Sequence, residues 1–271
     1  MLRHVKDLED YKITATDGDI GKVSDFYFDD EYWTIRYLVA NTAELREPAN
    51  RVLISPIAFR EADFVTQRFH LNLTRDKVRS SPSVDLEKPV SRQYEREYFQ
   101  YYNWPYYWGY GGIWGSGQLP GPLAVADGWR EEEEQEPVGD PHLRSVREVR
   151  GYHIKGLDAE IGHVEDFIVD DASWTIRYLV VNTSNWWVGK SVLLAPQWIE
   201  QISWPESLVH VKLPREIIRR SPEWKSDQPI DRDYEMRLYK HYGWPTYWLD
   251  ELEGVPTQPT SKWPEVSQHR T

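Results

Sequence analysis

The chain has 271 residues, 40% of them hydrophobic and 28% charged, a composition typical of a globular protein with room for two domains. It contains no cysteine, which excludes disulfides, thiolate nucleophiles and thiolate metal sites. The net charge is −12, and residues 127–140 carry −6 of it, because seven acids there accompany a single Arg130. The remainder supplies no basic stripe for phosphates, so direct binding of nucleic acid is disfavoured.

Residues 1–7 lack the apolar stretch of a signal peptide, and no later window approaches the roughly 20 apolar residues of a membrane span. The sequence therefore predicts a cytoplasmic protein. Peripheral association with a membrane complex stays open, because it requires no spanning segment.

An internal repeat organises the chain. Residues 19–42 align with residues 160–183 at an offset of 141, and 16 of these 24 positions are identical. After a one-residue deletion the match continues at an offset of 140 as far as Tyr107-Trp108, which align with Tyr247-Trp248. The sequence predicts four parts, namely a first repeat (1–110), a Gly/Pro-rich and acidic linker (111–142), a second repeat (143–249) and a disordered tail (250–271).

The pattern of the first repeat predicts short strands followed by two helices. Segments rich in β-branched and aromatic residues predict strands at 11–16, 20–28, 33–41, 51–54 and 69–73. Asp17-Gly18 and Asp29-Asp30 predict the turns between the first three strands. In the second repeat Ala159 replaces Gly18, which predicts a longer turn or different backbone angles. Five or six strands in roughly 75 residues predict a small barrel whose closure removes exposed edges.

The two predicted helices follow the strands. The first covers 74–80, and the second begins after an N-cap at Ser91, or at Asp231 in the second repeat. Tyrosines recur at three-to-four spacing along this second helix, at Tyr94, Tyr98, Tyr101 and Tyr102. The predicted fold class is mainly β with short helices, as two tandem small barrels that are each followed by an aromatic helical extension.

The order of these turn and core positions resembles that of the PRC-barrel family, which includes the cytoplasmic domain of the photosynthetic reaction-centre H subunit and the C-terminal domain of the ribosome-maturation factor RimM. The residues that carry the resemblance in the first repeat are Leu8, Ile13, Asp17-Gly18, Ile20-Gly21-Lys22-Val23, Asp25, Asp29, Trp33 to Val39 and Val52-Leu53-Ile54 before Pro56. Their counterparts are Val149, Ile154, Asp158, Ile161-Gly162, Val164, Asp166, Asp170, Trp174 to Val180 and Val192-Leu193-Leu194 before Pro196.

The 271 residues contain no counterpart of the H subunit's membrane helix or of RimM's additional N-terminal barrel, so neither specific function carries over. The resemblance implies a bacterial module that binds other macromolecules, chiefly proteins. It leaves open a role beside an electron-transport complex.

Acids clustered at the predicted turns are the first candidate site. Carboxylates at a turn could hold a hard cation such as calcium. No loop here has the ligand spacing or the glycine of a calcium hand, and Asp side chains commonly bond their own backbone in such turns, which is the favoured interpretation. The candidate residues are Asp25, Asp29, Asp30, Asp166, Asp170 and Asp171.

Two histidines and two arginines repeat. His70 and His210 occupy matching strand positions, where they could meet across a pseudo-dyad to bind a metal or sense pH, although solvent-side strand histidines are the favoured interpretation. Arg36 and Arg177 could form two hydrogen bonds to a partner's carboxylate. Pairing with the unit's own acids, such as Asp25 or Glu95, is the structural alternative.

A Tyr/Trp-rich segment at 94–114, with a shorter copy in the second repeat, could cradle a sugar, a proline-rich peptide or a partner helix. Docking of the helix onto the barrel is the alternative, and residues 110–114 are hardest to explain as core. The candidate interaction surface comprises Arg36, Arg177, Tyr107, Trp108, Trp114, Tyr247 and Trp248.

No Gly-rich phosphate loop, nucleophile elbow or His-Glu-x-x-His motif occurs, so the sequence predicts no enzyme, no catalytic residue and no cofactor. We expect a protein-interaction or scaffold module whose two similar faces engage protein partners or each other, homo-oligomer contacts included. The alternative is a binding protein that responds to a small ligand or a cation through the acidic turns or an aromatic cleft.

Overall fold

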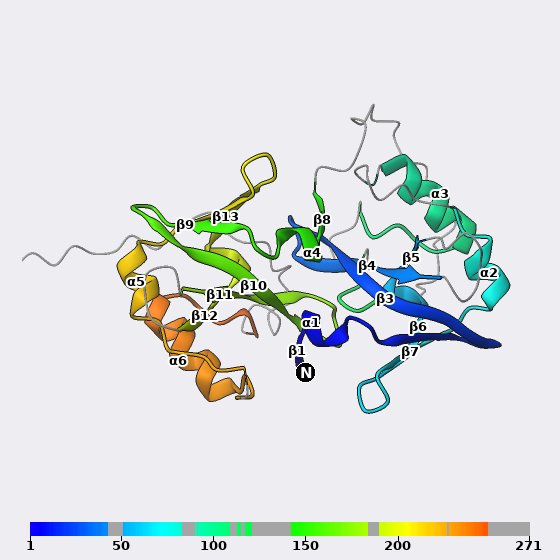
Figure 1. The fold of residues 1–271 in the computed structure, drawn as a ribbon, viewed down its shortest axis with the longest axis horizontal. Coiled ribbons are helices and arrows are strands. Elements are labelled where there is room, and N and C mark those ends of the chain that lie inside the picture. Colours follow the sequence, from blue (N-terminus) through cyan, green and yellow to red (C-terminus); the bar gives the residue numbers. More distant parts are fainter. Residues whose placement is uncertain are drawn as a thin grey trace, which may run out of the picture.

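A computed structural model describes residues 1–42, 51–82, 90, 92–108, 113–114, 117–120, 142–183, 190–226 and 228–248. The fold is mainly β with short helices, as predicted, and contains two seven-stranded sheets (Figure 1). Most of the predicted linker, the predicted N-cap Ser91 and the whole predicted tail lie outside the described residues. No helix of the described part is long and apolar enough to cross a membrane.

The first repeat confirms each predicted strand and helix to within two residues at either end, and adds β1, α1 and β6. In chain order its elements are β1 (Leu2–His4), α1 (Val5–Leu8), β2 (Lys12–Ala15), β3 (Gly18–Asp29), β4 (Thr34–Asn41), β5 (Arg51–Ile54), the 3-10 helix η1 (Pro56–Ala58), β6 (Phe59–Asp63), β7 (Arg68–Leu71), α2 (Arg75–Arg79) and α3 (Arg92–Tyr102).

The second repeat follows the same order, and the Asp231 side chain caps its last helix by accepting the Tyr234 N–H at 2.8 Å. Its elements are β8 (Leu143–Ser145), α4 (Val146–Val149), β9 (His153–Lys155), β10 (Glu160–Asp170), β11 (Ile176–Asn182), β12 (Ser191–Leu194), the 3-10 helix η2 (Pro196–Trp198), β13 (Ile199–Ser203), β14 (Leu208–Val211), α5 (Arg215–Arg219) and α6 (Arg232–Tyr242).

Strand order is the same in both sheets, β5-β4-β3-β2-β7-β6 and β12-β11-β10-β9-β14-β13. Neighbours are antiparallel except for the parallel pairs β2 with β7 and β9 with β14. Among the described residues no backbone pairing joins β5 to β6 or β12 to β13, so the sheets are open and the predicted closure into barrels is not present. The side of β12 that faces away from β11 makes an isolated bridge instead, between Ser191 and Trp224.

Glycine is required where β3 passes close to the end of β4, and where β10 passes close to the end of β11. A Cβ built on Gly21 would lie 1.9 Å from the carbonyl oxygen of Asn41, and one on Gly162 would lie 2.0 Å from that of Asn182. Any side chain here would collide with backbone, which explains why both repeats carry glycine at this position.

The first hairpin differs between the repeats, as the change from Gly18 to Ala159 predicts. In the first repeat two residues separate β2 from β3, and Gly18 adopts φ 139°. In the second repeat four residues separate β9 from β10, and the Gly156 N–H donates to the Ala159 carbonyl at 2.9 Å. The longer turn spares Ala159 the positive φ that glycine tolerates.

The two repeats exchange their first strands. β1 of the first repeat pairs with β10 of the second, with Arg3 opposite Val169. Reciprocally, β8 of the second repeat pairs with β3 of the first, with Arg144 opposite Phe28. Helices α1 and α4 follow these strands and contact β10 and β3. Each sheet therefore combines six strands of one repeat with one strand of the other, and the repeats form a single pseudo-twofold body.

A strained backbone turn joins the repeats at the pseudo-dyad. Trp33 and Trp174 adopt left-handed φ values of 51° and 60°, which are unusual for bulky residues. The Trp33 carbonyl accepts the Ile176 N–H at 2.6 Å, and the Trp174 carbonyl accepts the Ile35 N–H at 2.8 Å. Two reciprocal hydrogen bonds between the repeats thus offset the local strain.

The Trp174 ring crosses into the core of the other repeat. Its centroid lies 5.2 Å from that of Phe59 and 5.8 Å from that of Phe69, both in the first repeat. The side chain is only 3% exposed, and one hydrophobic cluster extends through both repeats. The two repeats therefore share one hydrophobic core and are not separately packed domains.

We expect Trp174→Ala to lower the free energy of unfolding by about 3–5 kcal/mol, because it leaves a cavity in the core of the first repeat. Urea titration followed by tryptophan fluorescence measures this loss. Trp204→Ala removes a half-exposed ring of the same repeat and serves as the control, with an expected loss below about 1 kcal/mol. Equal losses for the two variants would show that Trp174 is not a core residue.

Candidate functional site

Asp25 and its counterpart Asp166 each hold the first helix of the opposite repeat. The Asp25 carboxylate accepts hydrogen bonds from Ser145 Oγ at 2.6 Å and from the Arg147 N–H at 3.1 Å. The Asp166 carboxylate lies 2.7 Å from His4 Nδ1 and accepts a hydrogen bond from the backbone N–H of Lys6 at 3.1 Å. The first N–H groups of a helix have no partner within the helix, so these carboxylates supply one from the other repeat.

Burial raises the pKa of Asp25, and the hydrogen bonds from Ser145 and Arg147 oppose this rise. The cost of desolvating the carboxylate is therefore partly met by donors of the other repeat. Asp25 is a structural acceptor at the contact between the repeats.

Asp30 and Asp171 hold the exchanged strands. The Asp30 carboxylate accepts from Arg144 Nε at 2.8 Å and lies 3.1 Å from His142 Nδ1, and its own N–H donates to the His142 carbonyl at 2.8 Å. Asp171 accepts from Arg3 Nε at 2.9 Å and from the N-terminal ammonium group at 2.5 Å. Burial raises the pKa of Asp30, and the Arg144 charge opposes that rise. Both acids at this turn therefore belong to the contact between the repeats.

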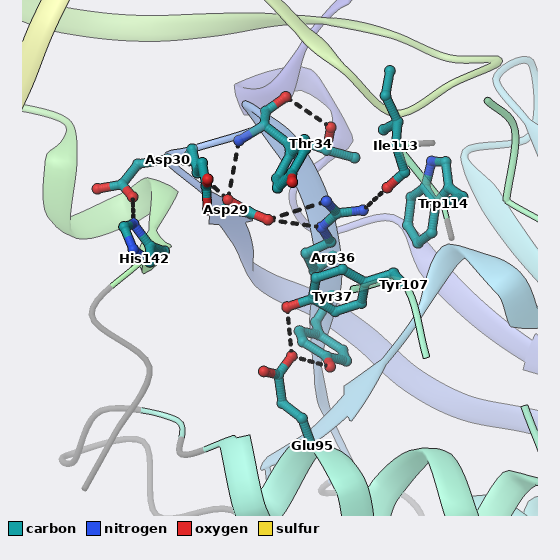
Figure 2. A network of polar contacts seen from close by, with 12 residues as sticks. Asp29, Asp30, Thr34, Arg36, Tyr37, Glu95, Tyr107, Ile113, Trp114 and His142 are labelled. Atoms are coloured by element: carbon teal, nitrogen blue, oxygen red, sulfur yellow. Dashed lines mark hydrogen bonds and ion pairs between the residues drawn. The ribbon is translucent and has the colours of Figure 1, made fainter. Parts of the chain in front are cut away.

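Asp29 is bound within its own repeat, as Figure 2 shows. Arg36 is 1% exposed and directs Nη2 and Nε at one carboxylate oxygen, at 3.0 and 3.3 Å. The other oxygen accepts the Glu31 N–H at 2.9 Å, which is the Asp turn that such positions favour. In the second repeat Arg177 Nη2 lies 3.4 Å from Asp170. The arginines thus pair with acids of their own repeat, and the acid is Asp29 rather than Asp25 or Glu95.

Aromatic rings and a backbone carbonyl complete the surroundings of Arg36 (Figure 2). Its guanidinium lies 3.9 Å from the ring centre of Tyr107 and 5.1 Å from that of Trp114, and it donates to the Ile113 carbonyl. Trp114 Nε1 donates to the carbonyl of Ser173 in the other repeat at 2.7 Å. Trp114 is therefore buried and bridges the repeats, whereas the neighbouring residues 109–112 lie outside the described part.

A buried carboxylate docks each aromatic helix on its sheet. Glu95 is fully buried and accepts from the Tyr37 hydroxyl at 2.5 Å, the Tyr107 hydroxyl at 2.8 Å and Arg92 Nη1 at 3.0 Å. The second repeat repeats the cluster with Glu235 as acceptor for Tyr178, Tyr247 and Arg232. The matching Tyr-Glu pairs at 94–95 and 234–235 are the sequence signal for this cluster, although the hydroxyl groups that bind Glu95 come from Tyr37 and Tyr107, which lie elsewhere in the sequence.

Most of the aromatic candidate surface faces the protein interior. Tyr107, Trp114, Tyr247 and both arginines are buried. Trp108 and Trp248 are half-buried and lie 4.3 and 4.2 Å from the guanidinium groups of Arg92 and Arg232. These rings pack the helices and the arginines, so they do not form an open cleft.

The two candidate histidines lie in different sheets. His70 is on β7, and His210 is on β14, beside β9 and β13 at the other end of the molecule (Figure 1). His210 Nε2 lies 3.6 Å from the Glu206 carboxylate of its own repeat. Within the described ranges, no group of three or more His, Cys, Asp and Glu side chains is arranged to hold a metal ion.

Neither a comparison with protein-family models nor a search of curated proteins finds a match to this chain. Inferences about function therefore depend on the geometry of the molecule itself.

We expect Asp25→Ala to destabilise the fold by about 1–2 kcal/mol, because it leaves the Ser145 hydroxyl and a helix N–H of the other repeat without their acceptor. Urea unfolding monitored by circular dichroism measures the change. Asp19→Ala, on the same strand but half exposed, is the matched control and should cost less than about 1 kcal/mol. A loss at Asp25 no larger than that at Asp19 would contradict the proposed capping.

Stability should fall as the pH rises above 10. Burial raises the pKa of Tyr27 and of Tyr102 from about 10 to about 12, because the phenolate is poorly solvated in the folded protein. A raised folded pKa contributes stability that is fully present below pH 10 and is lost between pH 10 and 12. Urea midpoints measured from about pH 8 to 12 should therefore drop in this window, and Tyr27→Phe should reduce the drop. A constant midpoint would refute this account.

Proposed function

We propose that this chain is a non-catalytic scaffold built from two PRC-type repeats, and that it engages protein partners through equivalent surfaces of both repeats. The exchange of strands supports the proposal, because it gives the two surfaces a fixed relative position. The acidic-turn alternative has less support, since these carboxylates already accept hydrogen bonds from arginines, helix N–H groups and the N-terminus.

Two hairpins carry the proposal. β6–β7 and β13–β14 project from opposite sides of the body, as the cyan and yellow loops in Figure 1 show. Val65 at the first tip is 93% exposed, and Trp204 at the second is 37% exposed. The Arg3 guanidinium lies 3.7 Å from the Phe64 ring centre, and that of Arg144 lies 5.1 Å from Trp204. Each tip is therefore supported by an exchanged strand.

At each tip an aromatic ring, Phe64 or Trp204, lies beside an arginine, and aromatic residues and arginine are enriched among interface anchors. Because the tips point in opposite directions, two partner molecules, or two sites on one large assembly, can be bound at once. Binding of two linked sites raises the overall affinity without new contacts at either tip. The observation that carries the proposal is this pair of exposed apolar tips on a body in which the two repeats exchange strands.

The test is affinity capture with crosslinking in the organism that encodes this chain, comparing the native protein with Val65→Asp/Trp204→Asp. Trp204→Asp removes an interface anchor and Val65→Asp places a charge at the exposed apolar tip, so capture of a specific partner should fall by about tenfold or more. Met236→Asp replaces an apolar residue on α6 that is 51% exposed, between the two tip residues in exposure, and serves as the control, with unchanged capture. A captured set that is the same for all three proteins would refute binding through the tips.

A further inference from the structure

Glu9 and Arg150 occupy the same position in the two repeats, 141 residues apart, and they form an ion pair with each other. Glu9 follows the last residue of α1, and Arg150 follows the last residue of α4. Their side chains are 23% and 16% exposed, so the pair is largely shielded from solvent. A residue that contacts its own counterpart lies at the pseudo-dyad.

The charges at this position discriminate between repeats. Two first repeats brought together in this arrangement would set Glu9 against Glu9, and two second repeats would set Arg150 against Arg150. Partly buried like charges repel strongly, since solvent and salt screen them little. Only the pairing of a first repeat with a second repeat places opposite charges against each other at this position.

Several other described contacts of the exchange do not discriminate in this way. The acceptors Asp25 and Asp166 are the same residue type. So are Trp33 and Trp174, whose carbonyls accept hydrogen bonds from the other repeat. His4 and Ser145 differ, yet each contacts the carboxylate offered to it. Either first segment would therefore suit either sheet at these points.

We propose that Glu9 and Arg150 form a pairing code that fits a first repeat to a second repeat and rejects two like repeats. The partner that this surface fits is a repeat of the opposite charge, supplied by the same chain or by a second copy of it. The code goes beyond the scaffold role, because it specifies how the repeats and copies of this chain assemble.

The repeat of the same chain has an advantage over that of a second copy. Residues 121–141 connect the described parts, and 21 residues can reach at most about 76 Å at 3.3–3.6 Å per residue. A covalent connection of at most this length corresponds to an effective concentration of one repeat for the other in the mM range. The native chain is therefore expected to be a monomer of 32.1 kDa at μM concentrations.

Reversing single charges tests the code within the chain. Glu9→Arg places a second guanidinium against Arg150, and Arg150→Glu places a second carboxylate against Glu9, so each variant should lose roughly 2–4 °C in Tm, as expected for a body of this size. The double variant Glu9→Arg/Arg150→Glu restores opposite charges and should recover most of that loss. A double variant as unstable as the two single variants would overturn the proposal.

Mixing the two single variants tests the code between chains. In a dimer that exchanges repeats, the first repeat of Glu9→Arg meets the second repeat of Arg150→Glu, and the reciprocal pair is also of opposite charge. An equimolar mixture at about 100 μM, unfolded and refolded together, should therefore form a 1:1 dimer of twice 32.1 kDa by light scattering. Each variant alone and the double variant should stay monomeric. A mixture that is folded by circular dichroism yet remains monomeric overturns pairing between chains.

Discussion

The structure depends on the unpaired edge of one long strand. β3 pairs with β2 only over its first five residues, from Gly18 to Lys22, although the strand continues to Asp29. The remaining edge would leave backbone N–H and C=O groups without partners, which is costly in a buried setting and a template for aggregation outside it. β8 of the other repeat pairs with the last three residues of this stretch, Tyr27 to Asp29, and β1 pairs with the last three residues of β10, Ile168 to Asp170. Neither sheet is complete without the other repeat.

This requirement explains the acids at the strand turns. Asp25, Asp30 and their counterparts lie along the covered edge, where they accept hydrogen bonds from the incoming strand and helix. Asp29 remains with its own repeat and neutralises the buried Arg36. In a cluster of carboxylates that resembles a cation site in sequence, Asp25, Asp30, Asp166 and Asp171 are thus satisfied by donors from 114 to 170 residues away.

Much of the local structure could be predicted from sequence, because strand alternation, glycine turns and caps depend on near neighbours. β4 and the Asp29 turn are examples. The exchange could not be predicted, since the pairing of Arg3 with Asp171 depends on which repeat supplies the edge strand, and both alternatives have the same local pattern. The burial of Trp114 could not be predicted either. Its sequence neighbours are rich in glycine, yet its ring is buried and donates a hydrogen bond to Ser173 of the other repeat. Tertiary contacts, not propensity, decide such positions.

Duplication within one chain permits a kind of divergence that a symmetric dimer does not. Off the dyad, a contact occurs twice with the same geometry, so Asp25 and Asp166 can each keep the same role. On the dyad of a symmetric dimer, two copies of the same charged residue would face each other. In this chain the two facing residues occupy different sequence positions, so that Glu9 can face Arg150. Similarity away from the axis and complementarity on it are therefore two results of one constraint. The fused chain has specialised where symmetry was unfavourable and has kept its repeats alike elsewhere.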